Sequence, residues 1–187
     1  MILKKMEILI EQIKEDGLVF EFDKSVETFP VLAEMVANGE CEFAVPIRTA
    51  LRALRIGDMV EIDGDIETSV YLPCNRCLQP FETPLKSHFE FTYMRRVADT
   101  IENSEPQEIE LSTEDMAIVY FQGEKINLKD TIQEQVVMAF PLRALCKQDC
   151  KGLCPKCGAD LNEDPCDCDR RSSLGKFAVL ENLKLEK

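Results

Sequence analysis

The sequence predicts an α+β fold, in which a curved, mainly antiparallel and barrel-like sheet carries a few short helices and a cysteine-rich C-terminal segment. Three observations lead to this prediction. Apolar and polar residues alternate over residues 60–74, which is typical of a long strand with one buried face. A helical spacing of apolar residues follows at 130–140, and six of the nine cysteines lie within residues 146–168.

Residues 1–95 are predicted to be mostly strands. The alternation within residues 6–10 and 18–22 indicates two early strands, and residues 30–37 are expected to form a short helix ended by Asn38-Gly39. The strand at 60–74 keeps its parity through Gly64, so we expect this glycine to mark a bend or bulge rather than a turn. Apolar residues from Phe81 to Tyr93 then continue the alternation on a returning strand, which places a cysteine pair at the tip of a hairpin.

The second half of the chain changes character twice. Residues 99–116 hold seven acidic residues and no Lys or Arg, which indicates either a solvated loop or a docking surface for a basic partner. In the helix predicted to end at Pro141, Asp130 or Thr131 is the expected N-cap. We therefore divide the chain into an α+β domain at 1–140, with a long central hairpin and an acidic loop, and a cysteine-rich segment with a C-terminal tail at 141–187.

The cysteines could form disulfides or bind a metal ion. Disulfide frameworks belong to short secreted chains, whereas 187 residues suffice for a substantial core. The N-terminal residues carry charges and show no signal-peptide pattern, and no stretch approaches the roughly 20 apolar residues of a membrane span. The sequence thus predicts a cytoplasmic protein, with no membrane partner, whose thiols are reduced.

The local sequence favours metal independently. Gly152-Leu-Cys-Pro-Lys-Cys-Gly158 is typical of a zinc knuckle, because Pro155 fixes one dihedral angle and Gly158 permits a positive one, so that both sulfurs of a tight turn point the same way. A thioredoxin-like redox role for the other close pair, Cys74 and Cys77, would require a helix N-terminus, whereas a strand precedes this pair.

Eight cysteines leave the number of Zn²⁺ ions open at one or two. With two ions, one site would use Cys154, Cys157, Cys166 and Cys168, and the other would use Cys74, Cys77, Cys146 and Cys150. The alternative is one site among the last six cysteines, with Cys74 and Cys77 simply reduced. The sequence alone favours the single site over two.

Catalysis finds little support in the sequence. The only histidine, His88, lies on the polar parity of a predicted strand, and an all-thiolate zinc site is normally closed and structural. Neither a phosphate-binding Gly-x-x-x-x-Gly-Lys-Ser/Thr loop nor a Gly-x-Gly-x-x-Gly motif is present. We therefore expect no enzymatic activity and no small-molecule substrate.

Several segments together resemble one known family. They are Leu72-Pro-Cys-Asn-Arg-Cys-Leu-Gln-Pro-Phe81 at the end of a long strand, Ile126-Asn-Leu-Lys-Asp-Thr-Ile-Gln-Glu-Gln135 at the start of a helix with its exit Phe140-Pro-Leu142, the cysteine-rich run 146–168, and the terminal stretch 176–184. Their order over residues 60–185 is similar to that of the YceD proteins, bacterial and plastid factors for the accumulation of large-subunit ribosomal RNA. The resemblance implies a non-enzymatic role in 23S rRNA accumulation and large-subunit biogenesis, with metal binding.

The charge bears on how such a role would be carried out. Lys and Arg number 22 against 35 Asp and Glu, a net charge of −13, whereas binding to a phosphate backbone relies on clustered cations. The leading hypothesis is therefore that the acidic surface binds a basic ribosomal protein or a large-subunit precursor particle. The alternatives are a zinc module that binds 23S rRNA directly through Arg170, Arg171, Lys151 and Lys156, and a thiol redox or zinc-buffering protein.

Overall fold

The computed structural model describes residues 6–14, 16–95 and 118–168. The predicted acidic loop at 99–116, Arg170, Arg171 and the terminal stretch 176–184 lie outside the described residues. The chain divides into two compact units, the first made of Met1–Leu72 and Phe81–Leu142 and the second of Pro73–Pro80 and Arg143–Lys187. Among the described residues, no helix is long and apolar enough to cross a membrane.

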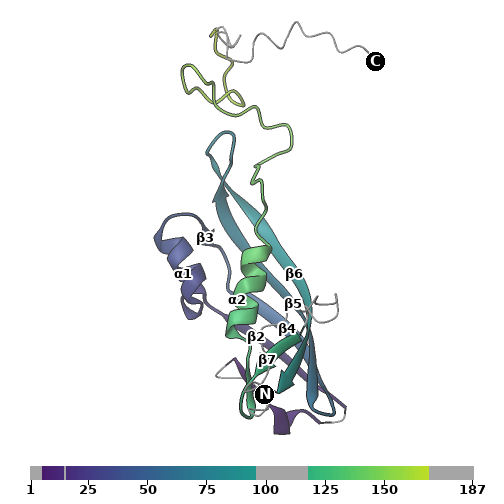
Figure 1. Cartoon of the computed structure of the whole chain (residues 1–187). Coiled ribbons are helices and arrows are strands. Elements are labelled where there is room, and N and C mark those ends of the chain that lie inside the picture. Colours follow the sequence, from purple (N-terminus) through teal and green to yellow (C-terminus); the bar gives the residue numbers. More distant parts are fainter. Residues whose placement is uncertain (1–5, 15, 96–117, 169–187) are drawn as a thin grey trace, which may run out of the picture. The chain divides into compact units, whose positions relative to one another are not determined.

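The first unit is a mainly antiparallel sheet with two helices (Figure 1). In chain order its elements are β1 (Glu7–Leu9), β2 (Leu18–Lys24), α1 (Pro30–Ala37), β3 (Glu42–Phe43), β4 (Ile47–Ile56), β5 (Met59–Pro73), β6 (Pro80–Arg95), β7 (Ile118–Phe121), β8 (Lys125–Asn127) and α2 (Lys129–Met138). The larger sheet has the order β2-β4-β5-β6-β7, with β3 added against β5, and β1 pairs with β8 separately. This sheet is open, with β2 and β7 at its edges. The prediction of a mainly antiparallel sheet is correct, but the sheet does not close into a barrel.

The long hairpin of β5 and β6 is the part of the fold that the sequence predicted most clearly. Buried and wet positions alternate along β5 as expected, with Ile62, Ile66 and Val70 buried on one face. Gly64, however, is neither a bend nor a bulge, because the register of β4 against β5 runs through it without interruption. An added Cβ there would lie 2.9 Å from the Leu51 Cβ and 2.9 Å from the ring of Phe89, so glycine is needed for space.

One face of the sheet is covered by α2, whose Ile132 and Val136 are buried. The helix begins differently from the prediction: Leu128 occupies the N-cap position without a side-chain cap, and Asn127 Oδ1 accepts a hydrogen bond from the Lys129 N–H at 2.9 Å. Thr131 was a candidate cap because of its spacing. It instead lies inside the first turn, where its hydroxyl is 2.7 Å from the buried Tyr93 hydroxyl on β6.

Candidate metal centre

The second unit brings all eight paired cysteines into two groups. One contains Cys74, Cys77, Cys146 and Cys150, and the other contains Cys154, Cys157, Cys166 and Cys168, with the four sulfurs of each group within 4.8 Å of one another. This is the partition that the two-site alternative predicted. The sequence alone had favoured a single site among the last six cysteines, with Cys74 and Cys77 reduced. The fold instead brings this pair to Cys146 and Cys150, 69 and 76 positions away along the chain.

Cys74–Leu78 form a first knuckle on the tight turn that joins β5 to β6. The Cys74 N–H donates to the Gln79 carbonyl at 2.9 Å, and the Leu78 N–H donates to the Cys74 carbonyl at 2.9 Å. Leu78 has φ 61°, the left-handed region that non-glycine residues rarely adopt. The turn buries both Cys74 and Cys77, whereas the Leu78 side chain is 64% exposed.

The second knuckle repeats the same backbone pattern. The Cys154 N–H donates to the Ala159 carbonyl at 2.8 Å, and the Gly158 N–H donates to the Cys154 carbonyl at 2.9 Å. Gly158, which corresponds to Leu78, has φ 75°. Cys-Pro-Lys-Cys-Gly thus forms the turn that its proline and glycine predicted, and Cys-Asn-Arg-Cys-Leu forms the same turn without either residue.

The spacing of the sulfurs is that of ligands around a common centre. Cys74 Sγ lies 3.8 Å from Cys150 Sγ, and Cys77 Sγ lies 3.8 Å from Cys146 Sγ. A disulfide would require about 2.05 Å. Four thiolates placed tetrahedrally at about 2.3 Å from an ion are about 3.8 Å apart. Each group could therefore hold one metal ion with four sulfur ligands.

Backbone N–H groups point at one sulfur in each group. Burial opposes ionisation of Cys74, yet the N–H groups of Cys146, Cys77 and Arg76 lower its pKa to about 6. The N–H groups of Cys157 and Lys156 likewise lower the pKa of Cys154 to about 6.

In each group another thiol ionises less readily. The pKa of Cys146 is raised to about 12, first by lost hydration and then by hydrogen bonds with the thiols of Cys150 and Cys74. The pKa of Cys168 is raised to about 12, first by a hydrogen bond with the Cys157 thiol and then by lost hydration. Each group thus contains one thiol that ionises readily and one that resists ionisation, a resistance that a divalent cation would relieve.

Arg76 and Gly152 join the two groups. Arg76 Nη1 donates to the Cys150 carbonyl at 2.7 Å, and the Arg76 carbonyl accepts from the Leu153 N–H at 3.0 Å. Gly152, with φ 74°, packs so closely that an added Cβ would be 2.9 Å from the Arg76 carbonyl oxygen. A residue between two ligands of the first group therefore fixes the segment that leads into the second.

Asn162 is a further supporting residue that sequence reasoning missed. Its Nδ2 lies 3.4 Å from Cys150 Sγ, and its Oδ1 accepts from the Lys151 N–H at 2.9 Å. Such contacts orient a ligating sulfur and reduce its charge. No local sequence signal identifies this role, because Asn162 lies twelve residues from the sulfur that it contacts.

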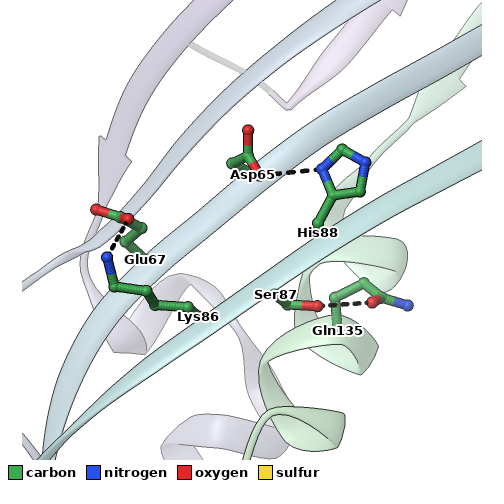
Figure 2. A network of polar contacts seen from close by, with 6 residues as sticks. All are labelled: Asp65, Glu67, Lys86, Ser87, His88 and Gln135. Atoms are coloured by element: carbon green, nitrogen blue, oxygen red, sulfur yellow. Dashed lines mark hydrogen bonds and ion pairs between the residues drawn. The ribbon is translucent and has the colours of Figure 1, made fainter.

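The remaining residues singled out from the sequence are distributed as follows. Lys151 and Lys156 are exposed in the second unit. His88 is exposed on β6, with Nδ1 3.0 Å from Asp65 Oδ1, as expected for a histidine on a solvated strand face (Figure 2).

Comparison with known proteins assigns the chain to a family. The family described as "Large ribosomal RNA subunit accumulation protein YceD" matches residues 62–184, which is well over half of the sequence and includes both cysteine groups. The chain belongs to the YceD family. The resemblance noted in the sequence is thereby confirmed, and the family's description names no catalytic activity.

Relatives within the YceD family are distant. The chain is 25% identical over 156 residues to the Arabidopsis thaliana protein "Large ribosomal RNA subunit accumulation protein YCED homolog 1, chloroplastic", an alignment that covers 74% of this chain and 49% of the plant protein. A Zea mays protein of the same name is 23% identical over 70% of this chain and 51% of its own length.

A bacterial relative is an uncharacterized protein of Mycobacterium leprae, 27% identical over 81% of this chain and 65% of its own length. This YceD chain thus spans about half to two thirds of the length of these curated relatives. No solved structure matches significantly.

Proposed function

We propose that this protein is a non-enzymatic factor in the accumulation of large-subunit ribosomal RNA, which acts by binding a ribosomal protein or a large-subunit precursor particle. The observation that carries the proposal is the YceD match over residues 62–184, together with the two four-cysteine groups inside it. The names of the Arabidopsis thaliana and Zea mays relatives refer to the same process. The RNA concerned would be 23S rRNA in a bacterial setting.

Zinc is the metal that the two groups fit best. Each group gathers four sulfurs, and the separations of two sulfur pairs in the first group, 3.8 Å, are those of a tetrahedron. Four thiolates suit Zn²⁺, which has no redox chemistry and prefers sulfur and nitrogen ligands. All four positions of each ion would be taken by protein, leaving none for water or substrate. We therefore assign Zn²⁺ a structural role, in which it joins the hairpin tip at 73–80 to the segment after residue 143.

The net charge of −13 supports a protein partner over general RNA binding. Each all-thiolate zinc site adds a charge of about −2, which makes contact with phosphates still less favourable. Ribosomal proteins are basic, so complementary charge would speed association and make it sensitive to salt. We further propose that the protein has no catalytic activity and is located in the cytoplasm.

Two measurements test this function. Depletion of the protein should lower the ratio of 23S to 16S rRNA. Affinity capture should recover large-subunit proteins or precursor particles at low salt and lose them at high salt. An unchanged rRNA ratio, together with no ribosomal protein recovered at either salt, would contradict the proposal.

Direct RNA binding by the second unit is the competing candidate, supported by the exposure of Lys151 and Lys156 beside the cysteine groups. Arg170 and Arg171, which lie outside the described residues, are the other cations that the sequence offers for this role. The double change of Lys151 and Lys156 to Glu, alone and combined with Arg170→Glu and Arg171→Glu, decides between the candidates. If the second unit binds RNA directly, these variants should bind a large-subunit rRNA fragment at least tenfold more weakly. Under our proposal their affinity for the fragment should be unchanged.

A further inference from the structure

The two faces of the larger sheet differ in what covers them. Ser87, on β6, points toward α2, where its hydroxyl lies 2.9 Å from Gln135 Oε1. Its neighbours Lys86 and His88 point away from the helix, together with Glu67 and Asp65 of β5 (Figure 2). The face opposite α2 therefore presents side chains of β2, β4, β5 and β6 to solvent, and we call it the open face.

Acidic side chains dominate the open face. The register of β2, β4 and β5 places six carboxylates there: Glu21, Asp23, Glu61, Asp63, Asp65 and Glu67. The outward positions of β6 add Glu82 and Glu90. The permanent cations on this face of the same four strands are Arg48, Arg52 and Lys86, so carboxylates exceed cations on the open face by eight to three.

The existing ion pairs leave much of this charge unbalanced. Arg48 pairs with Glu21 at 3.4 Å, and Lys86 pairs with Glu67 at 2.7 Å. Within the described part of the chain, Glu61 and Asp63 make no ion pair, although Arg52 stands opposite Asp63 in the register. Side chains at every second position of a strand are about 6.7 Å apart, so Glu61, Asp63 and Asp65 form an evenly spaced row of negative charge.

A groove of about 380 Å³ opens at one end of this row. Its apolar lining comes from Val45, Pro46 and Pro84, and charged side chains of both signs, including Asp23 and Arg48, border it. Val45 is 47% exposed. The groove can therefore accept an apolar side chain next to the acidic row.

From the row, the groove and the open face together, we propose that this face binds an extended basic segment of a protein partner, with cationic side chains at alternate positions along β5 and an apolar side chain in the groove. An extended chain has the same two-residue repeat as β5, so its cations can meet successive carboxylates without bending. The inference rests on the proposed function and specifies where the basic partner docks. It differs from nucleic-acid binding in sign, since phosphates would be repelled here.

The test uses the full chain with zinc and a labelled synthetic peptide that has lysine at alternate positions and threonine between. A second peptide of the same composition, with its lysines in one block, is the matched probe. Fluorescence anisotropy at low salt should show the alternating peptide bound several-fold more tightly than the block peptide. Neutralising the row with Glu61→Gln, Asp63→Asn and Asp65→Asn should weaken that binding about tenfold.

The control variant neutralises three exposed carboxylates away from the open face, with Glu11→Gln, Glu34→Gln and Glu124→Gln. It has the same net charge as the β5 variant and should weaken binding by no more than about twofold. Equal losses in the two variants would show a diffuse effect of net charge and would overturn the proposal. Failure of the unaltered protein to prefer the alternating peptide would also overturn it.

Affinity capture of large-subunit proteins separates this inference from the proposed function. If the β5 variant captures as much as the unaltered protein, the docking surface is wrong and the proposed function stands. If the unaltered protein captures none, the proposed function fails first. A large-subunit rRNA fragment that binds the unaltered protein and is lost with the β5 variant would assign the face to RNA and contradict a basic protein partner.

Discussion

The two knuckles have the same backbone hydrogen bonds but depend on different parts of the chain for them. The second knuckle, at Cys154–Gly158, is local: its proline and glycine favour the turn, and its partner cysteines follow nine and eleven residues after Cys157. The first knuckle has Leu78 in the left-handed region, and its sulfurs face Cys146 and Cys150, 69 and 76 residues away. The same ligand geometry can therefore come from local sequence preference or from tertiary contacts that hold a less favourable turn.

Loss of one ligand from each group gives the largest expected difference. With zinc bound as proposed, Cys74→Ser should reduce the metal content from two ions to one and lower the free energy of unfolding by about 5 kcal/mol or more, given apparent zinc-binding free energies of about 10–16 kcal/mol. Cys157→Ser should also leave one ion, but at a smaller cost. The first group closes a roughly fivefold longer loop, and that difference in closure entropy is about 1.5 kcal/mol.

Native mass spectrometry and calorimetry check this pair of variants. Two ions in Cys74→Ser would show that the second group and the rest of the chain bind metal without the first knuckle. One ion in the unaltered protein, unaffected by Cys74→Ser, would confine the metal to the last six cysteines.

Substitutions of Gly152 and Gly158 in the second unit should lower stability by different amounts. Gly158→Ala changes a residue with φ 75° and open space around it, so we expect a loss of about 1 kcal/mol in the free energy of unfolding. Gly152→Ala has the same backbone problem, and its new methyl group would also meet the Arg76 carbonyl oxygen at 2.9 Å. A loss of about 3 kcal/mol is expected. Urea unfolding of the zinc-loaded proteins measures both, and equal losses would contradict the close approach to Arg76.

Arg76 and Lys156 occupy the same position in their knuckles and provide the next comparison. Arg76 donates to the Cys150 carbonyl at 2.7 Å, so Arg76→Ala should cost about 1.5–2 kcal/mol. Lys156 is exposed, and Lys156→Ala should cost less than about 0.5 kcal/mol. Arg76→Ala should also speed the removal of metal by a chelator, whereas Lys156→Ala should not. Indistinguishable metal-release rates would argue against a bridging role for Arg76.

The smallest expected effect is a gain. Leu78 has φ 61° and a mostly exposed side chain, so Leu78→Gly should relieve backbone strain at little cost in packing. We expect the zinc-loaded protein to become more stable by up to about 1 kcal/mol, which thermal unfolding can resolve. A loss of stability would mean that the Leu78 side chain contributes contacts worth more than the strain.

Local pattern was sufficient for the elements that depend on one segment. The bounds of α1 and β5 and the turn of the second knuckle agree with the sequence because a proline, a glycine or a strict two-residue alternation specifies each of them. The pattern was misleading where a neighbour decides the outcome. Gly64 accommodates the ring of Phe89, and Thr131 bonds Tyr93 instead of capping α2, and neither partner is adjacent in the sequence.

The cysteine groups show the same division. The sequence by itself determined that thiols occur in close pairs, that one pair lies in a favourable knuckle, and that the long hairpin carries another at its tip, because each of these depends on residues a few positions apart. Only the tertiary structure decided that Cys74 and Cys77 join Cys146 and Cys150. That association depends on Arg76 and Gly152 meeting across 76 positions of the chain, a contact that no local spacing encodes.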